Sequence, residues 1–460
     1  MNKWIIIISL LSVVITGKVE AQQLPNTLSD SEKLYGLSRF WQEVNYNFVY
    51  FEKVDHERWD SAYLALLESI TETPNDYEYY RELQRFCALL NDGHTNIMLP
   101  PGITEWRTMF GEYRLIFENI EGKAIVTHVN LSKKDDLPVG SELIEVNGMP
   151  VRDYIDQYVK PYISTNADYI REDLSIQRVL LGVEGQSYDV VFRKPDQSTI
   201  TMQLTHAFTE EAEFYPPFNT SEMLEYETIE DKIGYLSLNT FENSQIVDLF
   251  MDKLPEIQDV EGLIIDLRKN GGGSTNYALD ILQYFTSDTL YGARVSTRLH
   301  LPYYKAVGSF ITDPSDTIGN ARAKKSLEIF LGIHMEPLGL NGYLVEVPMS
   351  ELIIIPTVFL IGHATASAAE DMLIYADGQD HMIKIGQRTY ASTGQPFLFD
   401  LPGGGRARIC TKKDTYADGR AFVGVGVKPD IEITPTLDDW IKRRDAALET
   451  AIEYLKKHMK

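Results

Sequence analysis

The sequence predicts an α/β protein whose mostly parallel core lies in the second half of the chain. Between residues 226 and 434, apolar strand patterns alternate with helical patterns, which is typical of a parallel sheet covered by helices. From 30 to 90, apolar residues recur at three- and four-residue spacing, which indicates helices. From 111 to 208, short strand patterns separated by turns predominate. A helical region, a strand-rich unit and an α/β core are therefore expected in this order.

The length supports more than one folding unit, because about 440 residues after the N-terminal segment exceed a single ordinary hydrophobic core. The expected parts are a helical N-terminal domain at 22–105, a strand-rich domain at 106–210, an α/β core at 220–440 with an insertion at 290–350, and a C-terminal helix at 441–460. The insertion is rich in aromatic and basic residues and is a candidate lid or substrate wall.

The N-terminus has the pattern of a secretory signal peptide at 1–21. Lys3 precedes an apolar run at 4–15, and Val19 and Ala21 are the small residues before the expected cleavage point. We therefore expect an exported protein, periplasmic or extracellular, with no integral membrane span after signal removal. Cys87 and Cys410 could pair in such a compartment or remain two separate buried thiols.

Composition and motifs exclude several classes of function. The formal net charge of −24 argues against nucleic acid and anionic membranes as partners. No HExxH motif, no Cys/His ligand spacing and no phosphate-binding loop occurs in the sequence, so we expect neither a metal nor another cofactor.

The most informative segment is 362–370, Gly-His-Ala-Thr-Ala-Ser-Ala-Ala-Glu. It follows an apolar run at 352–361 that predicts a buried strand, and it precedes a helical pattern at 368–375. Ser367 therefore lies at a helix N-terminus, where unpaired N–H groups can stabilise a developing oxyanion. Alternatively, Ser367 and Glu370 have the S-x-x-E spacing of a capping box, which requires no catalysis.

A second segment, 262–273, is an apolar strand that ends in Asp-x-Arg-x-Asn-x-Gly-Gly. Together the two segments resemble the C-terminal processing (tail-specific) peptidases and the related tricorn core proteases. The resemblance implies that Ser367 is the nucleophile and that backbone N–H groups of Gly272 (or Gly271) and Ala368 form the oxyanion hole. Asp266 and Arg268 are expected to organise the turn.

The general base differs from that of the classical members of this family, which use a lysine about 25 residues after the serine. The corresponding position here is Ser392, or Ala391 in a shifted alignment, so a Ser–Lys dyad is not expected. Tricorn-type enzymes use a histidine from the preceding domain, and the segment 90–95 resembles that motif. This resemblance implies that His94 is the base.

The remaining members of the site are less well determined by the sequence. Tricorn-type enzymes place an orienting serine before the histidine, where this chain has Gly93, and a late glutamate, where it has Val423. The candidates to orient His94 are Asp92, Glu370 and Ser392. The competing bases are His363, Lys384 and Lys412.

The strand-rich unit has its own resemblance. The string Pro-x-Gly-x-x-Leu-Ile-x-Val-Asn-Gly-x-x-Val at 138–151 resembles a PDZ domain. Such a domain binds an extended peptide at a sheet edge, often through its C-terminus, or it only packs against the core and gates it. The family resemblance further implies a core of the Clp-protease/crotonase type.

The expected function is that of an exported serine endopeptidase, which hydrolyses peptides or proteins through an acyl-enzyme on Ser367. The alternative is a non-catalytic protein that binds peptides or hydrophobic ligands on the same scaffold. The retinoid-binding proteins of the eye resemble this family and act as carriers, so the fold does not guarantee proteolysis.

Overall fold

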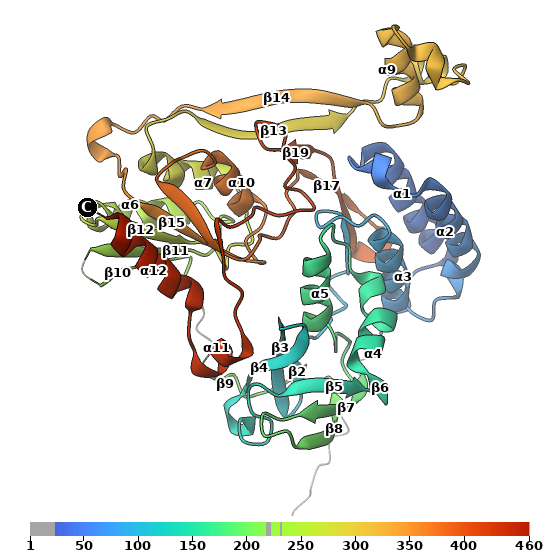
Figure 1. Ribbon diagram of the computed structural model, residues 1–460. Helices are drawn as coiled ribbons and strands as arrows, with labels where there is room; N and C mark the ends of the chain where they lie inside the picture. The colour runs from blue at the N-terminus through green and yellow to red at the C-terminus, as the bar shows by residue number, and fades with distance from the viewer. Residues whose placement is uncertain (1–23, 218–221, 231, 460) are drawn as a thin grey trace, which may run out of the picture.

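The computed structural model describes residues 24–217, 222–230 and 232–459 (Figure 1). The expected signal peptide at 1–21 lies outside these residues. Within the described ranges, no helix combines the length and apolar character needed to cross a membrane.

A six-stranded sheet forms the centre of the second half of the chain. Its strands lie in the order β10 (Leu224–Ile229), β11 (Ile233–Leu238), β12 (Gly262–Asp266), β15 (Thr357–Ile361), β16 (Met382–Gly386) and β20 (Ile431–Glu432). Strand β10 is antiparallel to β11, and the other neighbours are parallel. Every residue of β12 and β15 is buried, as expected for parallel strands covered on both faces. The predicted, mostly parallel α/β core is confirmed.

Helices cover both faces of this sheet. Residues of α12 (Ala446–His458), among them Ala451, pack on one face against Ile264 and Leu360. The apolar residues at alternate strand positions face the opposite way, because side chains alternate along a strand. They pack against α6 (Gln245–Ile257), α7 (Thr275–Leu282) and α10 (Ala368–Tyr375). The expected C-terminal helix is thus α12, preceded by the short α11 (Leu437–Lys442).

The first part of the chain forms helices that pack into the core. Its helices are α1 (Asp30–Asn47), α2 (His56–Ser69) and α3 (Asp76–Ala88). The following strand β1 (Asn96–Met98) pairs with β18 (Arg406–Cys410), which also pairs with β17 (Pro396–Asp400). The buried apolar residues of these helices and those of the α/β core form one continuous cluster. Residues near the end of α3 are therefore held against the α/β core.

The middle of the chain forms a second sheet with its own hydrophobic cluster. Its path is β2 (Met109–Phe110), β3 (Tyr113–Ile120), β4 (Lys123–Asn130), β5 (Glu142–Val146), β7 (Ser187–Arg193) and β8 (Thr199–Thr205), with β6 (Met149–Pro150) beside β5 and β9 (Phe214–Tyr215) beside β4. The unit also contains α4 (Val151–Tyr158) and α5 (Asp168–Gln177). Helix α5 is fastened to β3, because Asn119 Nδ2 donates to Asp173 Oδ1 at 2.7 Å.

The insertion at 290–350 forms an arm. Strands β13 (Leu290–Arg298) and β14 (Met335–Tyr343) make a long hairpin that carries α8 (Pro302–Gly308) and α9 (Ala321–Phe330) at its far end (Figure 1, yellow to orange). Strand β19 (Lys413–Thr415) pairs with β13. The arm is attached to the end of α1, where Arg298 donates to the backbone oxygens of Asn45 and Phe48, both at 2.9 Å.

The two cysteines of the described chain do not form a disulfide. Cys87 and Cys410 are both buried and free. Of the two possibilities that the sequence left open, the structure shows separate thiols.

Candidate active site

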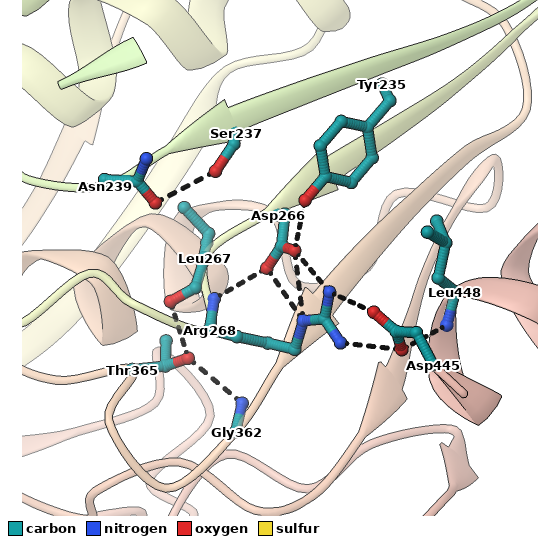
Figure 2. A network of polar contacts seen from close by, with 10 residues as sticks. All are labelled: Tyr235, Ser237, Asn239, Asp266, Leu267, Arg268, Gly362, Thr365, Asp445 and Leu448. Atoms are coloured by element: carbon teal, nitrogen blue, oxygen red, sulfur yellow. Dashed lines mark hydrogen bonds and ion pairs between the residues drawn. The ribbon is translucent and has the colours of Figure 1, made fainter. Parts of the chain in front are cut away.

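Ser367 lies in the turn between β15 and α10. Its backbone has φ 55° and ψ −120°, a conformation that costs about 1–3 kcal/mol for a residue with a Cβ. The turn is held by Thr365, whose Oγ1 donates to Leu267 O at 2.9 Å and accepts from Gly362 N at 3.1 Å (Figure 2). These bonds join the turn to the end of the neighbouring strand β12. Ser367 is therefore held rigidly where α10 begins.

His94 approaches this serine from the turn between α3 and β1. Its Nε2 lies 3.4 Å from Ser367 Oγ, and its Nδ1 lies 2.6 Å from Ser392 Oγ. The imidazole is buried. Burial lowers the pKa of His94 to about 4, and the positive charges of Arg408 and Lys412 act in the same direction. The imidazole is therefore neutral at neutral pH.

The position of Ser392 depends on the glycine that precedes His94. A Cβ atom at Gly93 would lie 2.9 Å from Ser392 Oγ and 3.1 Å from Ser392 Cβ. Contacts this short would push Ser392 away from the histidine. The missing side chain at Gly93 thus leaves the space that the Ser392 hydroxyl occupies.

Glu370 connects the serine to the loop that carries Ser392. Its fully buried carboxylate accepts from the backbone N–H groups of Ser367 at 3.2 Å, Ala391 at 2.8 Å and Ser392 at 3.0 Å. It also accepts from the Thr389 hydroxyl. Burial raises the pKa of Glu370 to about 8, and the four donors act in the opposite direction. This carboxylate sets the relative positions of the two serines through their backbones.

The glycine turn after β12 lies directly against Ser367. A Cβ atom on Gly272 would be 2.6 Å from Ser367 Cβ and 2.8 Å from Ala366 O, and its φ of 101° also favours glycine. The Gly272 N–H donates to Asn270 Oδ1 at 2.9 Å. The backbone oxygen of the same asparagine accepts from Ala366 N at 3.0 Å. Asn270 therefore couples the glycine turn to the segment that carries the serine.

A cavity of about 610 Å³ opens at Ser367. Four residues of α5 line it together with His94, the glycine turn and Arg408. Among the described residues, no member of the 290–350 insertion lines this cavity. The structure therefore does not support the insertion as a lid or wall of this site.

Known proteins show the same fold and sequence pattern. Residues 232–433 match peptidase family S41. The carboxyl-terminal-processing protease of Picosynechococcus sp. (strain ATCC 27264 / PCC 7002 / PR-6) is 20% identical over 409 residues, which cover 87% of this chain and 82% of the relative. The segment that matches this family is slightly less than half of the chain. Together with the relative, it identifies the protein as a serine peptidase, a hydrolase.

Solved structures agree on the fold. Mature CPAF in complex with lactacystin has a TM-score of 0.65 at 15% identity, with 94% of this chain and 98% of that chain covered. A putative peptidase from Parabacteroides merdae ATCC 43184 has a TM-score of 0.51 at 16% identity, with 93% and 97% covered. These likenesses establish a mixed α/β fold similar to that of S41 peptidases.

In this peptidase, the expected organisers of the glycine turn form a polar network (Figure 2). The Arg268 guanidinium bonds to Asp266, with Nε 3.0 Å from Oδ1, and Tyr235 Oη donates to Asp266 Oδ2 at 2.7 Å. Arg268 also bonds to Asp445, with Nη1 2.9 Å from Oδ1 and Nη2 2.8 Å from Oδ2. Asp445 caps α12 by accepting from Leu448 N. The network fastens the C-terminal helix to the end of β12 and lies beside the site.

Each of the competing bases is paired with a carboxylate. Lys384 forms an ion pair with Asp430 at 3.2 Å, and Lys412 forms one with Asp414 at 3.0 Å. His363 lines the cavity, but its Nδ1 is bonded to an Asp173 carboxylate oxygen. In contrast to these three, His94 lies within hydrogen-bond distance of Ser367.

The candidate orienters are also distinguished. Asp92 accepts from Thr95 Oγ1 at 2.7 Å, and its other oxygen is buried without a partner among the described residues. Burial raises the pKa of Asp92 to about 6. The imidazole Nδ1 instead contacts Ser392. Of the three orienters that the sequence suggested, Ser392 is the one that contacts the imidazole of His94.

Sequence reasoning missed two contributors to this site. Asn270 had a visible signal, because an Asn two residues before a glycine is typical of an Asx turn. The wall formed by α5 had none, since Ile170 and Gln177 carry no motif and reach the cavity only through the packing of the second sheet. A local pattern can reveal the first kind of residue but not the second.

Proposed function

We propose that this peptidase hydrolyses internal peptide bonds of peptide or protein substrates through an acyl-enzyme on Ser367, with His94 as general base. The supporting observation is the array in which His94 Nε2 lies 3.4 Å from Ser367 Oγ while Nδ1 lies 2.6 Å from Ser392 Oγ. The longer distance is within the range found before substrate binds, when catalytic hydrogen bonds are often loose.

The tautomer follows from the two contacts. To accept the serine proton, Nε2 must carry none, so the single proton of the neutral imidazole lies on Nδ1 and is donated to Ser392 Oγ. Ser367 Oγ then attacks the scissile carbonyl carbon as its proton passes to Nε2. The tetrahedral adduct collapses, the C–N bond breaks, and the leaving amine takes that proton from His94. Water deprotonated by His94 hydrolyses the ester and releases the second product.

The oxyanion would be held by backbone donors beside Ser367. The Ala368 N–H is at the first position of α10, where the helix itself offers no acceptor. The second donor comes from the glycine turn. Because the Gly272 N–H already donates to Asn270, Gly271, which lines the cavity, is the better placed of the two glycines.

The role of Ser392 leads to a specific prediction. The Ser392→Ala variant leaves the buried Nδ1–H of His94 without an acceptor, a loss of about 1–3 kcal/mol. We expect kcat to fall about 10- to 100-fold with little change in KM, measured by steady-state hydrolysis. In the double variant Gly93→Ser with Ser392→Gly, residue 93 instead of residue 392 supplies the hydroxyl in the space beside His94. This double variant should be more active than Ser392→Gly alone, and equal activities would contradict an orienting role.

The lowered pKa of His94 predicts the pH dependence of the reaction. Only the neutral imidazole accepts a proton, so kcat/KM should rise through a pH of about 4 and stay level above it, rather than rise near 6.5. Arg408→Gln removes one cation that lowers this pKa and should move the acidic limb part of the way toward 6.5. A limb near 6.5 in the wild type would show that another group, or a solvent-exposed histidine, is the base.

The strand-rich unit at 106–210 is proposed to be a PDZ-like domain that serves as a wall of the active site. Its helix α5 lines the cavity at Ser367. The Asn119–Asp173 bond joins α5 to β3, at the kind of helix–strand edge where such domains accept a peptide. Packing against the core is thus better supported than capture of a free C-terminus at the edge of this sheet. Export to the periplasm or medium is proposed on the signal-peptide pattern alone.

The proposed function is tested by covalent labelling. Wild-type protein treated with a fluorophosphonate should gain one adduct, which peptide mass spectrometry should locate at Ser367, and it should degrade unfolded casein. The His94→Gln protein should label far more slowly. A wild-type protein that neither labels at Ser367 nor degrades casein would contradict the proposal and favour the non-catalytic binding protein.

A further inference from the structure

A second cavity of about 600 Å³ adjoins the one at Ser367, and it is lined by arginines. The two cavities share Gly93, Leu174, Tyr390 and Arg408 as lining residues. The second cavity lies where α3, the segment around β1 and the end of α5 meet. It does not contain Ser367 or His94.

The charge of this cavity is opposite to that of the protein. Its lining includes four arginines and a single acidic residue, in a chain with a formal net charge of −24. Arg81 is paired with that acid, Glu105, at 3.3 Å, and its guanidinium lies 3.7 Å from the Tyr162 ring centroid. Arg408 Nε donates to an amide oxygen, that of Asn96, at 3.0 Å. The lining of this cavity therefore contains one carboxylate and four guanidinium groups.

Two of the arginine side chains have no hydrogen-bond or ion-pair partner within the described residues. Neither the Arg107 nor the Arg178 side chain forms a hydrogen bond or an ion pair with any residue in the described part of the chain. Burial lowers the pKa of Arg178, and the neighbouring cations Arg107 and Arg81 add to this effect. Like charges held together inside a concave surface produce a field that attracts an anion. An arginine with free donors binds a carboxylate in a bidentate manner.

From this cavity we infer a subsite that binds a carboxylate of the substrate peptide a short distance from the scissile bond. The inference rests on the proposed peptidase function, because it assigns the neighbouring cavity to the same substrate chain. The carboxylate would be that of a chain end or of an Asp or Glu side chain. Both offer the same planar anion to Arg107 and Arg178.

The test measures binding rather than hydrolysis, so its outcome is separate from that of the labelling test. Four fluorescein-labelled probes share one alanine-based decapeptide, with a central Glu or Gln and a free or amidated C-terminus. Fluorescence anisotropy gives Kd for each on the Ser367→Ala protein, alone and combined with Arg107→Gln and Arg178→Gln. The matched control is Arg85→Gln, because Arg85 is exposed and lies outside both cavities.

We expect a charged probe to bind more tightly than the neutral Gln-amide probe. The Arg107→Gln and Arg178→Gln changes should raise the Kd of the charged probe about tenfold or more and leave the Kd of the neutral probe unchanged. Lysine at position 178, in Arg178→Lys, should restore part of the lost affinity. Preference for the free C-terminus identifies a chain end, and preference for Glu in the amidated peptide identifies a side chain. The inference is overturned if no charged probe binds more tightly than the neutral one, or if the arginine variants weaken charged and neutral probes equally.

Discussion

The Ser367→Ala protein is expected to lose hydrolysis of any confirmed substrate by about 10⁴-fold or more in kcat/KM. The substitution removes only the hydroxyl group, whose oxygen lies 3.4 Å from His94 Nε2. Without it no acyl-enzyme can form, and the remaining donors can only bind the substrate. The measurement is steady-state hydrolysis of a quenched fluorescent peptide that the wild type cleaves.

The same variant should fold normally, which makes its loss of activity interpretable. Glu370 bonds to the backbone N–H of residue 367 and not to its side chain, so alanine keeps this bond. The melting temperature should therefore stay close to that of the wild type. Ser309→Ala, an exposed serine on the arm outside the cavity, is the matched control and should retain full activity. Wild-type rates for Ser367→Ala would refute the nucleophile assignment.

His94→Gln is expected to lower kcat by a comparable factor, about 10⁴-fold, because the base and the nucleophile act as one unit. Glutamine fills a similar volume and can accept a hydrogen bond, but its amide cannot take up the serine proton. Steady-state kinetics of the single and double variants provide the measurement. Adding Ser367→Ala to His94→Gln should cause little further loss, since each change disables the same step.

The matched histidine control lies in the same cavity. His363 lines it but bonds to Asp173, so His363→Gln should reduce the rate far less than His94→Gln does. The reverse order of effects would identify His363 as the base and His94 as a structural residue. If both variants kept most of the activity, a histidine mechanism at Ser367 would be wrong.

The strands and the turns of the site could be predicted because each depends on a short stretch of chain. The runs of β12 and β15 are apolar at nearly every position, as burial on both faces requires. The serine lies at a strand-to-helix turn. The glycine backbone after β12 can pass close to Ser367 because it has no side chain; a Cβ atom on Gly272 would lie only 2.6 Å from Ser367 Cβ. Composition and residue order within about ten positions were sufficient for these features.

The residue that contacts the His94 imidazole could not be predicted in the same way. Asp92, Glu370 and Ser392 were all candidates in the sequence. Asp92 is the nearest of them to the histidine in the chain, but its side chain accepts a hydrogen bond from Thr95. Ser392 is 298 positions from His94. Its selection depends on the space at Gly93 and on the bond of its backbone to Glu370.

The turn that carries Ser367, the glycine turn and the α/β core are properties of local sequence. Hydrophobic periodicity, the start of a helix and the residues of a turn are each encoded within a few positions. The assembly of His94 with Ser367, 273 positions away, is a property of the folded chain. It requires the helical region to share one hydrophobic cluster with the core and β1 to pair with β18. The arginine-lined cavity arises in the same way, because burial of apolar surface brings together three segments whose charges show no pattern along the chain.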